Sequence, residues 1–205
     1  MEERIVIPCR DVRLEGVFHT GDDPRNAVVI THPHPLYGGN MENPVVRTIA
    51  DAYAGAGYTT LRFNFRGTDG SSGRFDNGTG EQDDVRASVA WLKSRGVHAV
   101  HLAGYSFGAW VNARVVSTGV DIEDHVMVSP PAGFISFDAV ETLSDTGFII
   151  TGSSDDIAPV RDIRALIDRW QIRPQFDVLD GCDHFYTSFL PILKKRLSAY
   201  LAGLH

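Results

Sequence analysis

The chain has 205 residues, of which 43% are hydrophobic and 22% charged, and its formal net charge is −7. This length and composition are those of a globular protein with one core, so we expect a single domain over residues 1–205. Nucleic acid is not expected as a partner, because its phosphate backbone selects basic surfaces. No apolar run approaches the ~18 residues that a membrane-spanning helix needs.

The cysteines and the N-terminus give an expectation about the compartment. Cys9 and Cys182 lie far apart in the sequence and form no CxxC pair, so we expect two free thiols. Residues 1–10, MEERIVIPCR, lack the apolar segment of a secretory signal. We therefore expect a cytoplasmic protein without membrane association.

Strand-like and helix-like segments alternate along the chain, which is typical of a mostly parallel sheet with helices on both faces. An opening hairpin is predicted over residues 3–9 and 12–19. Short apolar runs rich in β-branched residues then predict buried strands. These strands are expected at residues 27–31, 58–63, 97–103, 125–129, 147–151 and 175–179.

Helices are predicted between these strands from apolar positions spaced three or four residues apart and from end signals. They are expected to begin near Pro44, residue 81, Phe107, Pro159 and residue 187. Two stretches, 64–80 and 130–146, are predicted as long loops, and long loops in compact domains often carry function.

A G-x-S-x-G motif stands in residues 102–109, LAGYSFGA, directly after a predicted strand and before a predicted helix. In this context the motif is typical of a sharp turn that exposes a serine hydroxyl above the sheet. Glycines at 104 and 108 leave out the Cβ atoms that would block so tight a turn. We therefore predict that Ser106 is a nucleophile; the alternative is a glycine-rich turn with an incidental serine.

A serine nucleophile needs a base, and the base needs an acid that orients it. In this architecture the acid and then the histidine follow the serine, each on a loop after a later strand. Of the eight histidines, His184 is the one on such a loop. Asp155 and Asp156 are both candidate acids; Asp155 is predicted because it lies nearer the strand end, whereas Asp156 could cap the next helix.

Acyl transfer also needs backbone N–H groups that stabilise an oxyanion. Phe107, the residue after the nucleophile, is expected to supply one of them. The second should come from the loop after strand 27–31, which reads THPHPLYGG. Its two prolines have no N–H. His34, Leu36 and Tyr37 are left, and His34 is favoured.

His32 and His34 form an H-x-H pair, which could bind zinc. A catalytic zinc site needs a third protein ligand, and no acidic residue follows the pair at a suitable spacing. Neither a metal nor another cofactor is therefore predicted. His32, Tyr37 and Tyr105 are expected to line the substrate cleft instead.

Five ordered motifs resemble those of the small cap-less bacterial α/β-hydrolases that are grouped near the dienelactone hydrolases. The motifs are HPHPLYGGNMEN, LRFNFRGTDGSSGRFDNGTGEQDD, GYSFG, GSSDDIAP and GCDHF, and they span nearly the whole chain. The resemblance implies an α/β-hydrolase fold without a cap domain. It also implies Ser106, Asp155 and His184 as nucleophile, acid and base, the 32–39 loop as the oxyanion side, and Arg66 as a loop anchor.

The predicted function is hydrolysis of small acyl esters through an acyl-enzyme. A thioesterase, a small peptidase or an amidase would use the same three residues, and a non-catalytic ligand-binding module on this fold is the alternative from another class. The nucleophile is serine, whereas dienelactone hydrolase has cysteine, so that enzyme's substrate is not carried over.

The cleft is expected to be open. Residues 130–146 are too few to form a packed lid. We therefore expect a shallow cleft rimmed by residues 34–42, 66–80 and 130–146. Such a cleft buries little apolar area and should favour short acyl chains.

Overall fold

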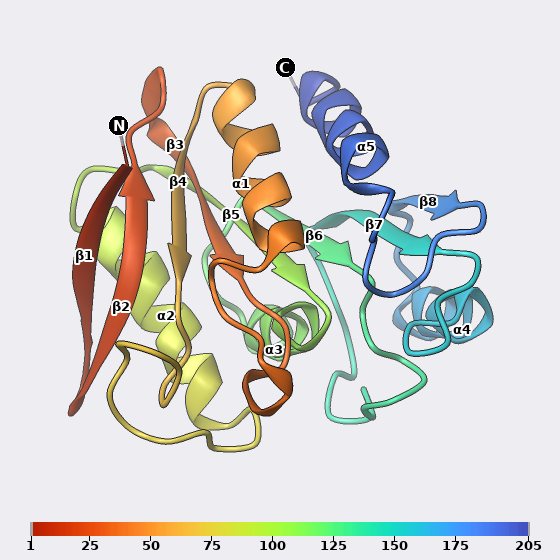
Figure 1. The fold of residues 1–205 in the computed structure, drawn as a ribbon, viewed down its shortest axis with the longest axis horizontal. Coiled ribbons are helices and arrows are strands. Elements are labelled where there is room, and N and C mark those ends of the chain that lie inside the picture. The colour runs from red at the N-terminus through yellow and green to blue at the C-terminus, as the bar shows by residue number, and fades with distance from the viewer. Residues whose placement is uncertain (1, 205) are drawn as a thin grey trace.

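The computed structural model describes residues 2–204, and its centre is an eight-stranded sheet (Figure 1). The strands lie in the order β1-β2-β4-β3-β5-β6-β7-β8. The hairpin β1 (Glu2–Cys9) and β2 (Val12–His19) is antiparallel, and β2 pairs antiparallel with β4 (Tyr58–Phe63). All other pairs are parallel, and they involve β3 (Asp23–Thr31), β5 (Ala99–Tyr105), β6 (Asp124–Val128), β7 (Thr146–Gly152) and β8 (Gln175–Leu179). The mostly parallel sheet predicted from the sequence is confirmed.

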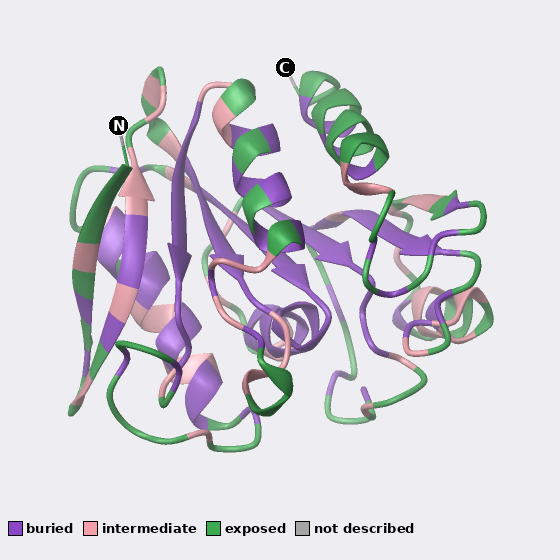
Figure 2. Cartoon of the chain, viewed as in Figure 1, coloured by how far each residue is buried: buried purple, intermediate pink, exposed green. Residues whose placement is uncertain are grey.

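Helices cover both faces of this sheet (Figure 1). One face carries α1 (Pro44–Gly55) and α5 (Leu190–Ala202), which pack together in one core cluster. The other face carries α2 (Gly80–Lys93), α3 (Phe107–Val116) and α4 (Val160–Trp170), which contribute to a second cluster. The sheet therefore separates two hydrophobic cores, and its strands are buried between them (Figure 2).

Strand β3 illustrates why the apolar runs are continuous. Successive side chains of a strand point to opposite faces of the sheet. Val29 accordingly packs in one core and Val28 in the other, and both are completely buried. A strand covered on both faces needs apolar residues at every position, and not only at alternate ones.

Several predicted boundaries shift in the structure; β3, for example, begins at Asp23 and not at residue 27. Strand β5 runs to Tyr105 and not to residue 103, because Gly104 and Tyr105 continue the pairing with Met127 and Val128 of β6. The extension carries the strand up to Ser106. Helix α5 begins at Leu190, three residues later than expected, with a proline in its first turn, where the missing N–H costs nothing.

The loops at the carboxyl ends of the parallel strands meet at one edge of the sheet, as they do in open α/β sheets generally. Residues 129–145 connect β6 and β7 without a helix or strand of their own, and no further domain is inserted there in the described chain. Both cysteines are free, as predicted, and both are buried. Among residues 2–204, no helix has the length and apolar character required to cross a bilayer.

Candidate active site

Ser106 occupies the turn between β5 and α3 in a strained backbone conformation, with φ 53° and ψ −119°. The glycines on either side make this turn sterically possible. A Cβ on Gly104 would lie 2.5 Å from the backbone nitrogen of Ala109, and a Cβ on Gly108 would lie 2.6 Å from the carbonyl oxygen of Thr31. Both distances are far below van der Waals contact, so the motif's glycines are required by the geometry of the turn.

A chain of hydrogen bonds joins the three predicted site residues. His184 Nε2 lies 2.9 Å from Ser106 Oγ, and His184 Nδ1 lies 2.8 and 2.9 Å from the two carboxylate oxygens of Asp155. With the proton on Nδ1, the imidazole donates to the carboxylate, and its free Nε2 accepts from the serine hydroxyl. All three side chains are buried, with exposed fractions of 8%, 6% and 3% for Ser106, His184 and Asp155.

The geometry distinguishes the two candidate acids. Asp155 reaches His184, and its Oδ1 also accepts the backbone N–H groups of Ile157 and Ala158, at 3.0 and 2.7 Å. Burial raises the pKa of the Asp155 carboxyl, but hydrogen bonds from His184 and Ala158 outweigh burial and hold that pKa below its ordinary value. Asp156 is exposed, and no side chain caps α4 at Pro159. The alternative role for Asp156 as a helix cap is therefore wrong.

A buried hydroxyl network lies behind Asp155. The Tyr186 hydroxyl is 2.8 Å from Ser129 Oγ, which lies 3.4 Å from Thr151 Oγ1, and Thr151 Oγ1 lies 3.4 Å from Asp155 Oδ2. A hydrogen bond from Ser129 also helps to lower the pKa of Asp155. Ser129 and Tyr186 both have positive φ, 43° and 56°. Sequence reasoning missed these residues, whose only signal is their place at the end of β6 and just after His184.

The loop predicted to form the oxyanion side, residues 32–39, contains a short 3-10 turn, η1 (Pro35–Tyr37), with His34 as its cap. The N–H of Tyr37 donates to the His34 carbonyl, and the N–H of Leu36 donates to His34 Nδ1. In the described chain, no hydrogen bond uses the backbone N–H of His34 or that of Phe107 at the start of α3. These are the two donors predicted from the sequence, and their rings are in contact, with centroids 4.8 Å apart.

His32 does not line the cleft, which corrects the expectation from the sequence. Its side chain is completely buried, with Nδ1 2.7 Å from the Pro33 carbonyl and Nε2 accepting the N–H of Phe65 at 3.0 Å. Burial lowers the pKa of His32 to about 4, so the ring is neutral near pH 7. His32 therefore anchors the 32–39 loop to the chain after β4. Within residues 2–204 no group of three metal-ligating side chains is arranged to hold an ion.

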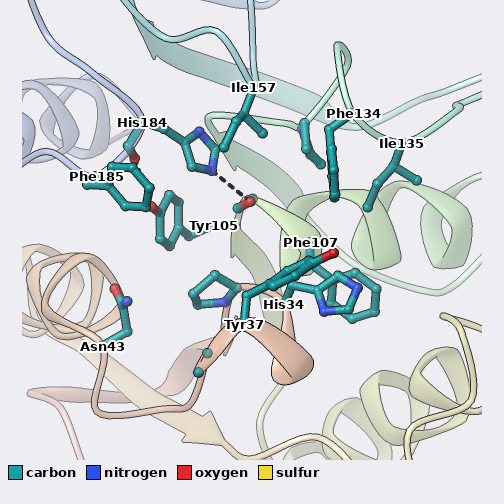
Figure 3. Close-up of a pocket in the computed structure, with 15 residues that line it drawn as sticks. His34, Tyr37, Asn43, Tyr105, Phe107, Phe134, Ile135, Ile157, His184 and Phe185 are labelled. Carbon is teal, nitrogen blue, oxygen red and sulfur yellow. Dashed lines mark hydrogen bonds between the residues drawn. The ribbon is translucent and has the colours of Figure 1, made fainter.

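A cleft of about 610 Å³ has Ser106 in its lining, and Figure 3 shows the side chains around it. Its lining comes from residues in 33–43, 105–107, 131–135, 157 and 184–185. Tyr37 and Tyr105 are among them, as predicted, and the Tyr105 hydroxyl donates to the His184 carbonyl at 2.7 Å. Two of the three expected rims are therefore present.

The third expected rim, residues 66–80, contributes no lining residue to the cleft. The loop lies behind the cleft wall instead, with the Phe75 ring 5.0 Å from that of His34 and 5.8 Å from that of Phe107. Arg66 anchors the loop by an ion pair of 2.7 Å with Asp84 of α2, whose side chain is completely buried. The backbone N–H of Ser72 donates to the carbonyl of Arg13 on β2. These contacts fit the anchoring role that the resemblance implies for Arg66, and they correct the predicted outline of the cleft.

A mostly parallel sheet with a serine at a strand–helix elbow, followed by an acid and a histidine on later strand loops, defines the class of α/β serine hydrolases. The sequence matches the model of the X-Pro dipeptidyl-peptidase (S15) family over residues 15–155, and the chain belongs to this family. A protein of Rickettsia prowazekii (strain Madrid E) is 34% identical over 200 residues, which cover 92% of this chain and 84% of that protein.

Solved structures agree with this assignment. An α/β serine hydrolase homologue from Coxiella burnetii is 32% identical, with a TM-score of 0.89 and 96% of each chain covered. An α/β serine hydrolase without a lid from Xanthomonas campestris is 28% identical, with a TM-score of 0.89 over 99% of this chain and 94% of that one. The predicted α/β-hydrolase fold without a cap domain is confirmed.

Proposed function

We propose that this protein is a carboxylic ester hydrolase that forms an acyl-enzyme at Ser106. The observation that supports the proposal is the hydrogen-bonded chain from Ser106 through His184 to Asp155 at the floor of the cleft. A serine hydroxyl becomes an effective nucleophile when an oriented imidazole takes its proton.

The reaction has two halves. Ser106 Oγ attacks the ester carbonyl carbon while His184 Nε2 takes the hydroxyl proton, and Asp155 stabilises the imidazolium. The N–H groups of His34 and Phe107 stabilise the oxyanion. The ester C–O bond then breaks, and the alcohol leaves with the proton from His184. In the second half, His184 takes a proton from water, the resulting hydroxide attacks the acyl carbon, and Ser106 leaves with that proton.

The lack of charged side chains among the described residues of the cleft favours an ester substrate over the peptide substrates of a dipeptidyl-peptidase, the activity in the family's name. A dipeptidyl-peptidase removes residues from a free N-terminus, whose α-ammonium is largely protonated near pH 7. No Asp, Glu, Lys or Arg side chain of residues 2–204 is among the residues that line the cleft. Desolvating an ammonium without a partner is costly, so an uncharged ester fits this cleft better.

Hydrolysis of p-nitrophenyl acetate, compared with glycyl-prolyl p-nitroanilide, tests this proposal. We expect the wild type to hydrolyse the ester, Ser106→Ala to lose at least a thousandfold in kcat, and the dipeptide to be a far poorer substrate. The kcat/KM values for a thioester and an anilide of acetic acid are measured as well, so that ester, thioester and amide leaving groups are compared on the same acyl group. Ser106-dependent cleavage of the dipeptide at a higher kcat/KM than the ester would overturn the proposal.

A further inference from the structure

Aromatic rings around the cleft form two groups, one that includes His184 and one across the cleft from it (Figure 3). The first group, the acyl wall, consists of His34, Tyr37, Phe107 and Phe134. The rings of His34 and Tyr37 lie 4.7 Å apart, those of His34 and Phe107 lie 4.8 Å apart, and those of Tyr37 and Phe134 lie 6.0 Å apart. Each of these rings therefore contacts another of the same group.

The second group, the alcohol wall, consists of Tyr105, His184 and Phe185. The His184 ring lies 5.4 Å from that of Tyr105 and 5.8 Å from that of Phe185. Asn43 lies on this side of the cleft as well (Figure 3). The Asn43 carboxamide, whose oxygen accepts the N–H of Val45, adds a polar group to this side. The two walls therefore differ in chemistry.

The proposed reaction assigns a part of the ester to each wall. The leaving oxygen must take its proton from His184 Nε2, so the alcohol portion lies on the side of His184. The carbonyl oxygen lies at the N–H groups of His34 and Phe107. The acyl portion takes the remaining direction, away from His184 and toward Tyr37 and Phe134.

The acyl wall is uncharged and offers exposed ring faces. Tyr37 and Phe134 are 75% and 57% exposed, and because their rings are in contact they form a contiguous apolar patch of the kind that commonly marks a binding site. Their rings meet at 64°, and they join the η1 turn to the loop after β6. Burial lowers the pKa of His34, which keeps its ring neutral. A carboxylate or ammonium on the acyl portion would find no counter-charge here.

We propose that the substrates are uncharged esters of an aromatic carboxylic acid, whose ring lies against Tyr37, Phe107 and Phe134. This inference rests on the ester hydrolysis proposed above. Edge-on and offset contacts between aromatic rings add to affinity beyond the area that they bury, by roughly two- to tenfold for one ring. A planar ring can make these contacts, and a saturated ring of the same size cannot.

The test compares p-nitrophenyl esters that share a leaving group: acetate, cyclohexanecarboxylate, benzoate and 4-carboxybenzoate. Each kcat/KM is divided by the rate constant of the same ester with hydroxide, which removes differences in intrinsic reactivity. We expect benzoate to exceed cyclohexanecarboxylate about three- to tenfold. We expect 4-carboxybenzoate, which carries a charge, to fall at least tenfold below benzoate.

Substitutions in the two walls test which wall produces the preference for benzoate. Phe134→Ala and Tyr37→Ala are expected to lower the ratio of benzoate to acetate by about three- to tenfold, and Phe134→Leu, which stays apolar, by a similar factor. Phe185→Ala removes a ring of comparable exposure, 68%, from the alcohol wall and should leave this ratio unchanged. Val6→Ala, exposed on β1 and outside the cleft, should change neither rate.

The outcomes separate this inference from the proposed function. Equal normalised rates for benzoate and cyclohexanecarboxylate would overturn the inference while Ser106-dependent acetate hydrolysis continues. A benzoate preference that is lost in Phe185→Ala and kept in Phe134→Ala would overturn the assignment of the walls. Absence of Ser106-dependent hydrolysis of every ester would overturn the proposed function and the inference with it.

Discussion

His184 Nε2 lies 2.9 Å from the Ser106 hydroxyl, although the two residues are 78 positions apart in the chain. Ser106 stands at the end of β5, and His184 follows β8 at the edge of the sheet. Parallel strands place their carboxyl ends at the same edge of the sheet, so distant loops meet there. The chemistry of the site therefore depends on the topology of the whole sheet.

Replacement of the two neighbouring aspartates should have very different effects. Asp155→Asn removes the carboxylate that holds the His184 tautomer, and we expect kcat to fall by about 10⁴. Asp156→Asn changes an exposed side chain, and kcat should stay within about threefold of the wild type. Steady-state kinetics on p-nitrophenyl acetate measures both, and a larger loss in Asp156→Asn would reverse the assignment of the acid.

The hydroxyl network behind Asp155 should position this carboxylate. Tyr186→Phe removes the hydrogen bond to Ser129, and we expect kcat to fall several-fold with KM nearly unchanged, because no substrate contact is lost. The free energy of unfolding should fall by about 1–2 kcal/mol, since a buried hydroxyl loses its partner. An unchanged kcat together with the loss of stability would limit this network to a structural role.

The elbow glycines give a steric prediction. Gly104→Ala places a Cβ 2.5 to 2.7 Å from backbone atoms of Gly108 and Ala109, so the turn must shift, and we expect a loss of stability of about 3 kcal/mol and of most activity. Gly55→Ala is the matched control, because a Cβ there meets nothing within 4 Å. It should be neutral or stabilising by up to about 1 kcal/mol in urea unfolding. Equal effects of the two substitutions would contradict the steric argument.

We expect acid to destabilise the fold because two histidines, His32 and His125, are buried in the neutral form. Burial lowers the pKa of His32 and that of His125 from 6.5 to about 4. Below pH 6.5 the unfolded chain binds protons that the folded chain does not, so stability is full above pH 6.5 and falls until about pH 4. Each histidine contributes about 3 kcal/mol to this loss.

Urea unfolding between pH 7.5 and 4.5 measures this dependence. We expect the free energy of unfolding to decrease steadily below pH 6.5, and His125→Phe to make the decrease shallower, since this ring lies in the core with only Nδ1 near a partner, Thr146. A free energy of unfolding that stays constant from pH 7 to 5 would show that these rings do not remain neutral in the folded state.

The sequence predicts the parts of this molecule that depend on local pattern. Continuous apolar runs identify the buried strands, and the spacing of Gly104 and Gly108 around Ser106 identifies the elbow, because both follow from backbone geometry. His32 could not be placed in this way. Its burial depends on the N–H of Phe65, which lies 33 positions further along the chain.

The same limit applies to the rim of the cleft and to the network behind the acid. Residues 66–80 lie behind the wall of the cleft, where Phe75 packs against His34 and Arg66 pairs with Asp84. These are contacts between segments that no local signal connects. Ser129 and Tyr186 form a hydrogen bond, and both have positive φ. Positive φ is uncommon for serine and tyrosine, so it could not be predicted from the sequence. The rim of the cleft and the network behind Asp155 therefore depend on contacts between distant segments, which local sequence patterns do not predict.

Intact-protein and peptide mass spectrometry after treatment with diisopropyl fluorophosphate tests the central claim most directly. This reagent phosphorylates a serine only where a neighbouring base activates its hydroxyl. We expect one adduct per chain, on the peptide that contains Ser106, with parallel loss of esterase activity, and slow or absent labelling in His184→Ala. An unlabelled wild-type protein, or an adduct on another residue while Ser106 stays free, would contradict the account.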